Sequence, residues 1–185
     1  MLFVISAPSG AGKTTIIREL FNILPGLRFS VSATTRPGRK IEKNGKDYYF
    51  ITRQEFEEKI SKGEFIEWEE VHGNLYGTLK SEVEKYLDNP LDLVFDVDVK
   101  GALNIKKIYP KSVCIFIDVP REELIERLKK RSTESESEIK KRRQRMDMEL
   151  SYKDRFDYIV VNRSVPGGIK QAVNEIVNII NKSKS

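Results

Sequence analysis

The sequence predicts an α/β protein with a parallel sheet flanked by helices. Short apolar runs alternate with amphipathic stretches along much of the chain, which is the order of strands and helices in such folds. The run 91–97 has the composition of a strand buried on both faces. A glycine-rich turn also joins the first apolar run, 2–6, to an amphipathic helix that begins at Lys13. The remaining strands expected in this sheet are 29–33, 112–117 and 158–161.

The glycine-rich turn reads Ala-Pro-Ser-Gly-Ala-Gly-Lys-Thr over residues 7–14 and fits the phosphate-binding P-loop, except that Ala7 replaces the usual first glycine. Backbone N–H groups and the positive end of the following helix converge on an anion in such a turn. Lys13 can reach the β- and γ-phosphates of a nucleoside triphosphate, and Thr14 offers a hydroxyl to Mg²⁺. The alternative is an ordinary strand–helix turn. The flanking strand and helix favour an ATP site made of Ala7, Pro8, Ser9, Gly10, Ala11, Gly12, Lys13, Thr14 and Thr15.

Local signals place the other elements of the first half. The first helix runs from Lys13 to about Leu24 and is stopped by Pro25-Gly26. A polar stretch, 36–46, predicts an exposed loop. Thr52 and Glu55 form a capping box that opens a helix ending at Gly63. Further β segments are expected at 47–51, 65–71 and 75–77, and a helix at 79–87.

The second half continues the alternation of strand and helix. A short helix is expected at 101–107 and another from Pro120 to Arg131. Ser135 and Glu138 form a second capping box, which opens a strongly basic helix. The closing helix carries an apolar stripe with helical spacing at Ile169, Val173, Ile176, Val177 and Ile180.

Two stretches interrupt this rhythm and predict insertions in a single core. Residues 33–90 look antiparallel, and residues 127–155 are strongly charged. The core is then built from 1–32, 91–126 and 156–185.

The composition is that of a soluble globular protein, because the 185 residues are 39% hydrophobic and 33% charged. No apolar run approaches the roughly 18 residues of a membrane helix, and the N-terminus has no signal-peptide pattern. One cysteine, Cys114, cannot form an internal disulfide, which agrees with a cytoplasmic protein. The net charge of +5 is weak evidence for either nucleic acid or small polyphosphates as partners. We predict no membrane and no nucleic-acid partner.

A second group of residues suits a phosphate monoester. Arg36 and Arg39 lie three residues apart with the Tyr48 hydroxyl nearby, and two guanidinium groups can clamp a phosphate. A solvated basic loop is the alternative, and this pattern alone does not decide between them.

Three acidic residues are candidates for ligand contacts. Glu67 lies in an apolar setting, where a carboxylate needs donors. A guanine edge supplies two, whereas a salt-bridged glutamate is the simpler alternative. Asp96 and Asp98 follow a buried strand, where open α/β sheets place ligands. Asp96 could hold Mg²⁺ through water, or both could be turn residues.

The charged insertion contributes further cations. Arg127 and Arg131 share a helix face at a spacing that makes like charges repel, which is easier to understand if an anion lies between them. Arg142 belongs to the same insertion. The alternative is a solvated face, and we expect one for Lys140, Lys141, Arg143 and Arg145. His72 is expected to be a surface residue in a turn.

Over essentially its full length the chain resembles the guanylate kinase family. The resemblance rests on six motifs in the family's order: the P-loop, Phe-Ser-Val-Ser-Ala-Thr-Thr-Arg, Asn-Gly-Lys-Asp-Tyr-Tyr-Phe, Glu-Phe-Ile-Glu-Trp, Gly-Asn-Leu-Tyr-Gly-Thr and Phe-Asp-Val-Asp-Val-Lys-Gly. It implies phosphoryl transfer from ATP to GMP with Mg²⁺, and a P-loop core carrying a GMP-binding insertion and a mobile lid.

The resemblance also assigns roles to residues. Guanine would be read by Ser32, Glu67 and Asp98, and the GMP phosphate would be held by Arg36, Arg39, Tyr48 and Tyr76, with Thr78 nearby. Lys13, Arg127, Arg131 and Arg142 would neutralise the transferring phosphoryl group, and Asn162 would contact adenine.

Some positions depart from the family pattern. The proline of the usual Thr-Thr-Arg-x-Pro-Arg is shifted by one place, although the spacing of Arg36 and Arg39 survives. A glutamine, a glycine and an acidic residue of the family pattern are replaced by Lys100, Ser132 and Arg163. These replacements bear on the motion expected of the lid and on the contact expected with adenine.

Two other functions remain as alternatives. Guanylate-kinase-like domains in scaffold proteins bind phosphopeptides without catalysis, but this chain keeps Lys13, Thr14 and the lid arginines. A kinase for another nucleoside monophosphate is the second alternative, and Glu67 with Ser32 favours guanine over it.

Overall fold

The computed structural model describes residues 1–71, 73–87, 91–130 and 136–184. Its core is a five-stranded sheet of order β2-β7-β1-β8-β9, and every neighbouring pair in it is parallel. The strands are β1 (Leu2–Ser6), β2 (Leu27–Phe29), β7 (Asp92–Asp96), β8 (Val113–Asp118) and β9 (Tyr158–Val161). The predicted parallel α/β core, the fold of P-loop NTPases, is therefore confirmed.

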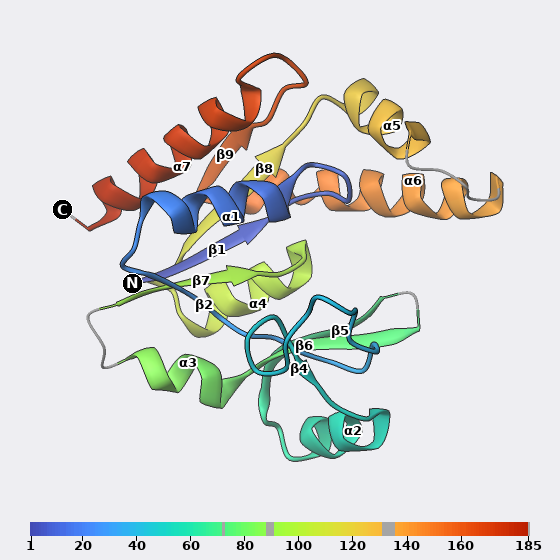
Figure 1. Ribbon diagram of the computed structural model, residues 1–185, viewed down its shortest axis with the longest axis vertical. Coiled ribbons are helices and arrows are strands. Elements are labelled where there is room, and N and C mark those ends of the chain that lie inside the picture. The colour runs from blue at the N-terminus through green and yellow to red at the C-terminus, as the bar shows by residue number, and fades with distance from the viewer. Residues whose placement is uncertain (72, 88–90, 131–135, 185) are drawn as a thin grey trace.

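Helices cover both faces of this sheet (Figure 1). On one face α1 (Lys13–Ile23) and α7 (Gly168–Ser183) lie side by side and share an apolar core with β1. On the other face α4 (Val99–Ile108) packs against β1 and β8 and forms a second apolar core. The helix α3 (Lys80–Leu87) contributes Val83 to this second core. The alternation of Phe3, Val4 and Ile5 between the two cores explains why all three are fully buried.

A second sheet lies beside the core, with the order β4-β3-β6-β5. Its strands are β3 (Ala33–Thr34), β4 (Tyr49–Phe50), β5 (Phe65–Val71) and β6 (Asn74–Leu79). The helix α2 (Arg53–Ser61) begins at the predicted capping box, and Phe56 of this helix stacks on Phe65 with ring centroids 4.3 Å apart. The pairs β5–β6 and β3–β6 are antiparallel as expected, but β3–β4 is parallel.

The predicted strand 29–33 is wrong, because the chain changes sheets inside it. Residues up to Phe29 pair with β7 in the core, whereas Ala33 pairs with Gly77 in the second sheet. A last core hydrogen bond runs from the Ser30 amide to the Val94 carbonyl at 2.9 Å. Ser32 therefore lies between the two sheets.

Two further helices, α5 (Arg121–Lys130) and α6 (Glu136–Leu150), precede a short 3₁₀ turn, η1 (Lys153–Arg155), and β9. An exposed Arg121–Asp147 ion pair joins α5 to α6. The carboxyl-terminal half of α6 packs against the core, since Met146 is fully buried and Glu149 nearly so. Arg131, His72 and the capping residue Ser135 lie outside the described residues.

The stripe of α7 differs from the prediction. Val173, Ile176 and Ile180 are buried as expected, but Ile169 is 42% exposed and Ala172 is buried instead.

Cys114 is buried and free, as predicted. Within the described ranges no helix is both long and apolar enough to span a bilayer.

Candidate active site

The P-loop connects β1 to α1 and curls around a pocket of about 430 Å³. Gly10 and Gly12 both have φ of 88°, a left-handed conformation that a side chain disfavours. The Ala11 amide donates to the Pro8 carbonyl at 3.1 Å and tightens the turn. Every residue from Ala7 to Thr15 lines the pocket, together with Val71, Asp98, Arg142, Arg145 and Glu149.

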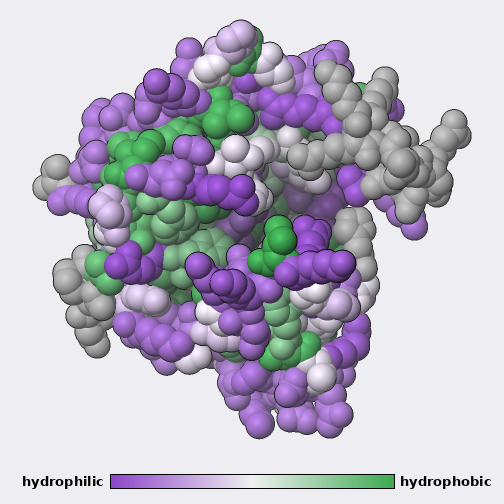
Figure 2. Space-filling model, viewed as in Figure 1, coloured by the Kyte–Doolittle hydropathy of each residue, from purple (hydrophilic) through white to green (hydrophobic). Residues whose placement is uncertain are grey.

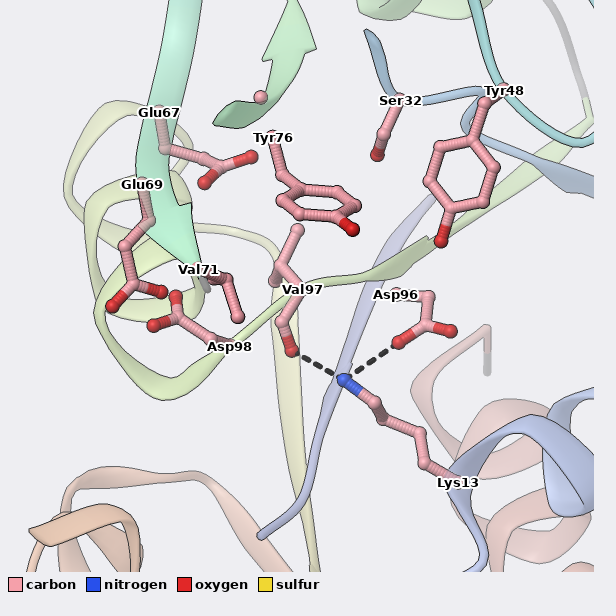
Figure 3. A pocket seen from close by; sticks show the side chains of 11 residues that line it. Lys13, Ser32, Tyr48, Glu67, Glu69, Val71, Tyr76, Asp96, Val97 and Asp98 are labelled. Carbon is pink, nitrogen blue, oxygen red and sulfur yellow. Dashed lines mark hydrogen bonds and ion pairs between the residues drawn. The ribbon is translucent and has the colours of Figure 1, made fainter. Parts of the chain in front are cut away.

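A second pocket, of about 200 Å³, opens between the core and the second sheet (Figure 3). On the outer surface, a hollow with hydrophilic borders lies between these two parts of the molecule (Figure 2). The lining contains six of the predicted residues outside the P-loop, brought together from distant segments: Ser32, Tyr48, Glu67, Tyr76, Asp96 and Asp98. Below we call it the acceptor pocket.

Lys13 stands at the boundary of the two pockets and lines both. Its Nζ lies 2.6 Å from Asp96 Oδ1 and donates to the Val97 carbonyl oxygen at 2.8 Å (Figure 3). Both groups are at the carboxyl end of β7, next to β1, where parallel sheets place ligands. Phosphates in the two pockets would therefore lie on either side of one cation.

Glu67 is buried in the acceptor pocket, where it is 8% exposed. The Thr78 hydroxyl donates to Glu67 Oε1 at 2.6 Å. Burial raises the pKa of Glu67 to about 7, although the Thr78 hydrogen bond opposes the shift. Among the described residues its partner is thus a hydroxyl and not the cation of the salt-bridge alternative. The other oxygen, Oε2, faces α4 so closely that a Cβ at Gly101 would lie 2.7 Å from it.

Asp98 caps the amino end of α4, with its Oδ1 accepting from the Gly101 amide at 2.8 Å. Among the described residues, Oδ2 is buried without a hydrogen-bond partner. A buried acceptor in that state favours a ligand donor.

Glu69 and Arg145 are among the residues of the site that the sequence analysis missed. Arg145 was expected on a solvated face, but its side chain is only 25% exposed and lies 3.1 Å from Glu69 and 3.0 Å from Glu149. Helical spacing could have indicated the pair with Glu149, because Arg145 and Glu149 lie four residues apart on one face of α6, but not the contact with Glu69. Glu69 follows Glu67 by two residues and so shares its face of β5.

The predicted phosphate clamp is partly assembled. Arg36 forms two hydrogen bonds with Glu42, at 2.9 and 3.0 Å, and its guanidinium lies 5.4 Å from the Tyr48 ring centroid. Burial raises the pKa of Tyr48 to about 12. Arg39 is exposed and does not line the acceptor pocket, although its amide donates to Glu42 at 2.8 Å. Sequence analysis did not identify Glu42 as the partner of this clamp.

The arginines that the resemblance assigns to the transferring phosphoryl group are placed differently. Arg127 donates to Ser164 Oγ at 2.8 Å, to the Asn162 carbonyl at 3.1 Å and to the Gly10 carbonyl at 3.4 Å, so it touches the P-loop backbone. Arg142 lines the P-loop pocket. Arg142 therefore lines this pocket and Arg127 contacts the P-loop backbone beside it, while Arg131 lies outside the described residues.

Asn162 is 1% exposed, and its amide nitrogen donates to the Ala11 carbonyl at 2.7 Å. A Cβ at Gly12 would lie 2.9 Å from that nitrogen, so the amide is packed against the P-loop. The side chain supports the loop in this structure, and its contact with adenine stays a prediction.

A P-loop on a parallel sheet, next to a pocket lined by Lys13 and by buried carboxylates and hydroxyls, defines a phosphotransferase of the P-loop NTPase fold. The family model described as guanylate kinase matches residues 1–182. The chain belongs to the guanylate kinase family.

Relatives with that name support this assignment. A guanylate kinase of Thermotoga maritima is 47% identical over 185 residues, which cover 100% of this chain and 87% of the relative. One of Chlorobium chlorochromatii is 46% identical over 181 residues, covering 97% of this chain and 95% of the relative. The crystal structure of guanylate kinase from Anaplasma phagocytophilum superposes with a TM-score of 0.77 at 32% identity, covering 98% of this chain and 85% of that one.

Proposed function

We propose that the protein transfers the γ-phosphoryl group of ATP to GMP and releases ADP and GDP. A phosphate oxygen of GMP forms a bond to the γ-phosphorus as the bond to the β–γ bridging oxygen breaks. The observation that carries the proposal is the position of Lys13, which lines both the P-loop pocket and the pocket that contains Glu67. No protein nucleophile is needed, because a GMP phosphate is already ionised near neutral pH and can attack directly.

The triphosphate binds along the P-loop, where amide groups from the turn and the start of α1 face its oxygens. Lys13 exchanges its contact with Asp96 for the β- and γ-phosphates. Arg127 and Arg142, with Arg131, neutralise the charge that develops on the moving phosphoryl group. Positioning and charge stabilisation supply most of the acceleration in this kind of reaction.

GMP binds in the acceptor pocket with its base toward Glu67 and Asp98. Guanine offers an N1–H and a 2-amino group, and both Glu67 and Asp98 Oδ2, which accepts no hydrogen bond from the described residues, can accept from such donors. Ser32, also on the lining, contributes a hydroxyl. Adenine has neither an N1–H nor a 2-amino group, so AMP would leave buried carboxylate oxygens unpaired, which lowers its affinity relative to that of GMP.

The phosphate of GMP is held by Arg36, Arg39, Tyr48 and Tyr76. Glu42 occupies Arg36 with both of its oxygens, so the incoming phosphate shares or displaces this partner. Arg39 is exposed and can fold toward a bound anion.

Mg²⁺ fits the oxygen donors at the edge of the P-loop, since hard cations take hydroxyl, carboxylate and phosphate oxygens. Thr14 would bind it directly and Asp96 through water. The ion supplies charge neutralisation for the phosphates when bound.

We further propose that dGMP is a second acceptor and that the reaction serves purine nucleotide metabolism in the cytoplasm. ATP and GMP are the partners expected for the two pockets, without a membrane or nucleic acid.

A coupled ADP-release assay with ATP, Mg²⁺ and each nucleoside monophosphate in turn tests the proposal. Turnover with GMP, alone or with dGMP, is the expected result. Turnover only with another monophosphate would keep the kinase and remove the guanine-reading roles of Glu67 and Ser32. A folded protein that binds GMP but has no turnover with any acceptor would favour the non-catalytic binding module.

A further inference from the structure

Arg145 of α6 is surrounded by three carboxylates. Its Nη2 lies 3.1 Å from Glu69 Oε2 of β5 and 3.8 Å from Asp98 Oδ2 at the start of α4. Its Nε donates to Glu149 Oε1 at 3.0 Å, one turn further along α6. These contacts join the second sheet, the end of β7 and the helix that follows α5 through one half-buried guanidinium.

Two of these carboxylates line the acceptor pocket. Glu69 and Asp98 face each other there, with their carboxylate groups close together (Figure 3). Neighbouring carboxylates repel, and burial together with Asp98 raises the pKa of Glu69 above its ordinary value, whereas Arg145 opposes that shift. Without the arginine, the two carboxylates would repel each other with no cation beside them, and Asp98 would have less reason to keep one orientation.

The third carboxylate connects Arg145 to the P-loop. Glu149 is 4% exposed, and its Oε2 accepts from the Ser9 amide at 3.1 Å. Arg145 itself lines the P-loop pocket. A continuous set of contacts therefore runs from Ser9 through Glu149 and Arg145 to Asp98.

We propose that Arg145 is a positioning residue for the guanine base of the acceptor: it fixes the positions of the Asp98 and Glu69 carboxylates and anchors both, through Glu149, to the P-loop. The proposal rests on the proposed function and deepens it. Arg145 is separate from the arginines expected to touch the transferring phosphoryl group. It acts on guanine through Asp98 and not through a contact of its own.

The test compares Arg145→Gln with Arg145→Lys and with a matched control, Arg121→Gln. Arg121 also forms an ion pair with α6, but its partner Asp147 lines neither of the two pockets. Steady-state kinetics with GMP and ATP varied separately would give both KM values, and calorimetry would give the dissociation constant of GMP.

For Arg145→Gln we expect a KM for GMP about tenfold higher, the size of one lost charge-assisted contact. The KM for ATP should change less than about threefold, and Arg145→Lys should recover most of the affinity because it keeps the charge. Arg121→Gln should match the unsubstituted protein. Equal changes in both KM values, failure of lysine to recover any affinity, or a Gln variant indistinguishable from the control would overturn the proposal.

A double substitution separates positioning from a general loss of structure. Glu69→Gln removes the like charge that Arg145 offsets, so Glu69→Gln/Arg145→Gln should bind GMP more tightly than Arg145→Gln alone. Additive losses in the pair would contradict the proposal, even if Arg145→Gln were poorly folded.

Failure of the proposed function would look different. If the unsubstituted protein binds GMP without phosphorylating it, the kinase proposal fails, while the calorimetric comparison still tests Arg145. If it neither binds nor phosphorylates GMP, both proposals fail.

Discussion

Lys13 and Asp96 form an ion pair of 2.6 Å at the boundary between the P-loop pocket and the acceptor pocket. Lys13 comes from the amino end of α1 and Asp96 from the carboxyl end of β7, and β1 and β7 are neighbours in the parallel sheet. The neighbouring positions of β1 and β7 in the sheet therefore place these two side chains next to each other. In the proposed reaction a triphosphate takes the place of Asp96 at Lys13, and the Asp96 carboxylate would then be able to hold Mg²⁺ through water.

Substitution of this lysine tests the phosphate side of the site. Lys13→Ala should lower kcat by about 10²–10³, the usual loss for one preorganised donor at developing charge. The coupled assay measures the rate, and circular dichroism checks the fold. Lys59→Ala, which breaks a part-buried pair with Glu64 outside either pocket lining, is the control and should keep full activity. Near-normal turnover of Lys13→Ala would contradict the P-loop assignment.

The selectivity for GMP over AMP tests the role of the buried Glu67 carboxylate. Glu67→Gln should lower the ratio of kcat/KM for GMP over AMP by about 10–100-fold, because an amide replaces one acceptor oxygen by a donor. Glu70→Gln is a matched control on the same strand, since Glu70 is half exposed and pairs with Arg53. An unchanged ratio in Glu67→Gln would remove Glu67 from base recognition.

The close approach of α4 to Glu67 gives a steric test. In Gly101→Ala the new Cβ would lie 2.7 Å from Glu67 Oε2, so the carboxylate must move. Alanine favours the helix, so the fold should be kept. We expect KM for GMP to rise about tenfold, which corresponds to about 1.4 kcal/mol. Gly26→Ala, whose Cβ meets nothing within 4 Å, should leave kinetics unchanged. If the two variants behave alike, Glu67 does not need its observed position.

The raised pKa of Glu67 also predicts a pH dependence of stability. The pKa rises from 4.5 to about 7 in the folded state, so between these values the folded protein holds more of a proton than the unfolded chain does. Stability from this group therefore falls as pH rises through this window, by at most about 3 kcal/mol. Asp98 reinforces the shift, whereas Thr78 and Lys13 oppose it.

Chemical denaturation between pH 5 and 8 measures this effect, in a window set by the shift of Glu67 from 4.5 to about 7. Relative to Glu67→Gln, the unsubstituted protein should lose stability as the pH rises, and Glu70→Gln should follow the unsubstituted profile. Parallel profiles for all three proteins would show that Glu67 is charged in the folded state throughout this range.

Much of the core was predictable because its signals are local. The P-loop, the doubly buried β7 and the Thr52 capping box each depend on short-range sequence patterns, and the structure has all three. The grouping of Glu67 with Asp98 was predicted only through the family resemblance, since 31 residues separate them in the chain. Their proximity arises from α4 packing against β5.

The wrong and missing predictions have a common physical cause: a local sequence pattern does not specify which distant segment of the chain it will contact. The apolar stretch 29–33 predicts a strand but carries no sign that the chain changes sheets after Ser30. Arg145 sits in a basic run that is typical of a solvated face, and only the approach of β5 makes it the partner of Glu69. Glu42 is likewise the partner of Arg36 only because the loop between them folds back, which the sequence pattern does not indicate.

The central claim is phosphoryl transfer from ATP to GMP, and product analysis tests it most directly. The purified protein with ATP, GMP and Mg²⁺ should form ADP and GDP in equal amounts, as separated by ion-exchange chromatography. ADP formed without GDP would show hydrolysis of ATP instead of transfer. Absence of both products from folded, GMP-binding protein would contradict the account.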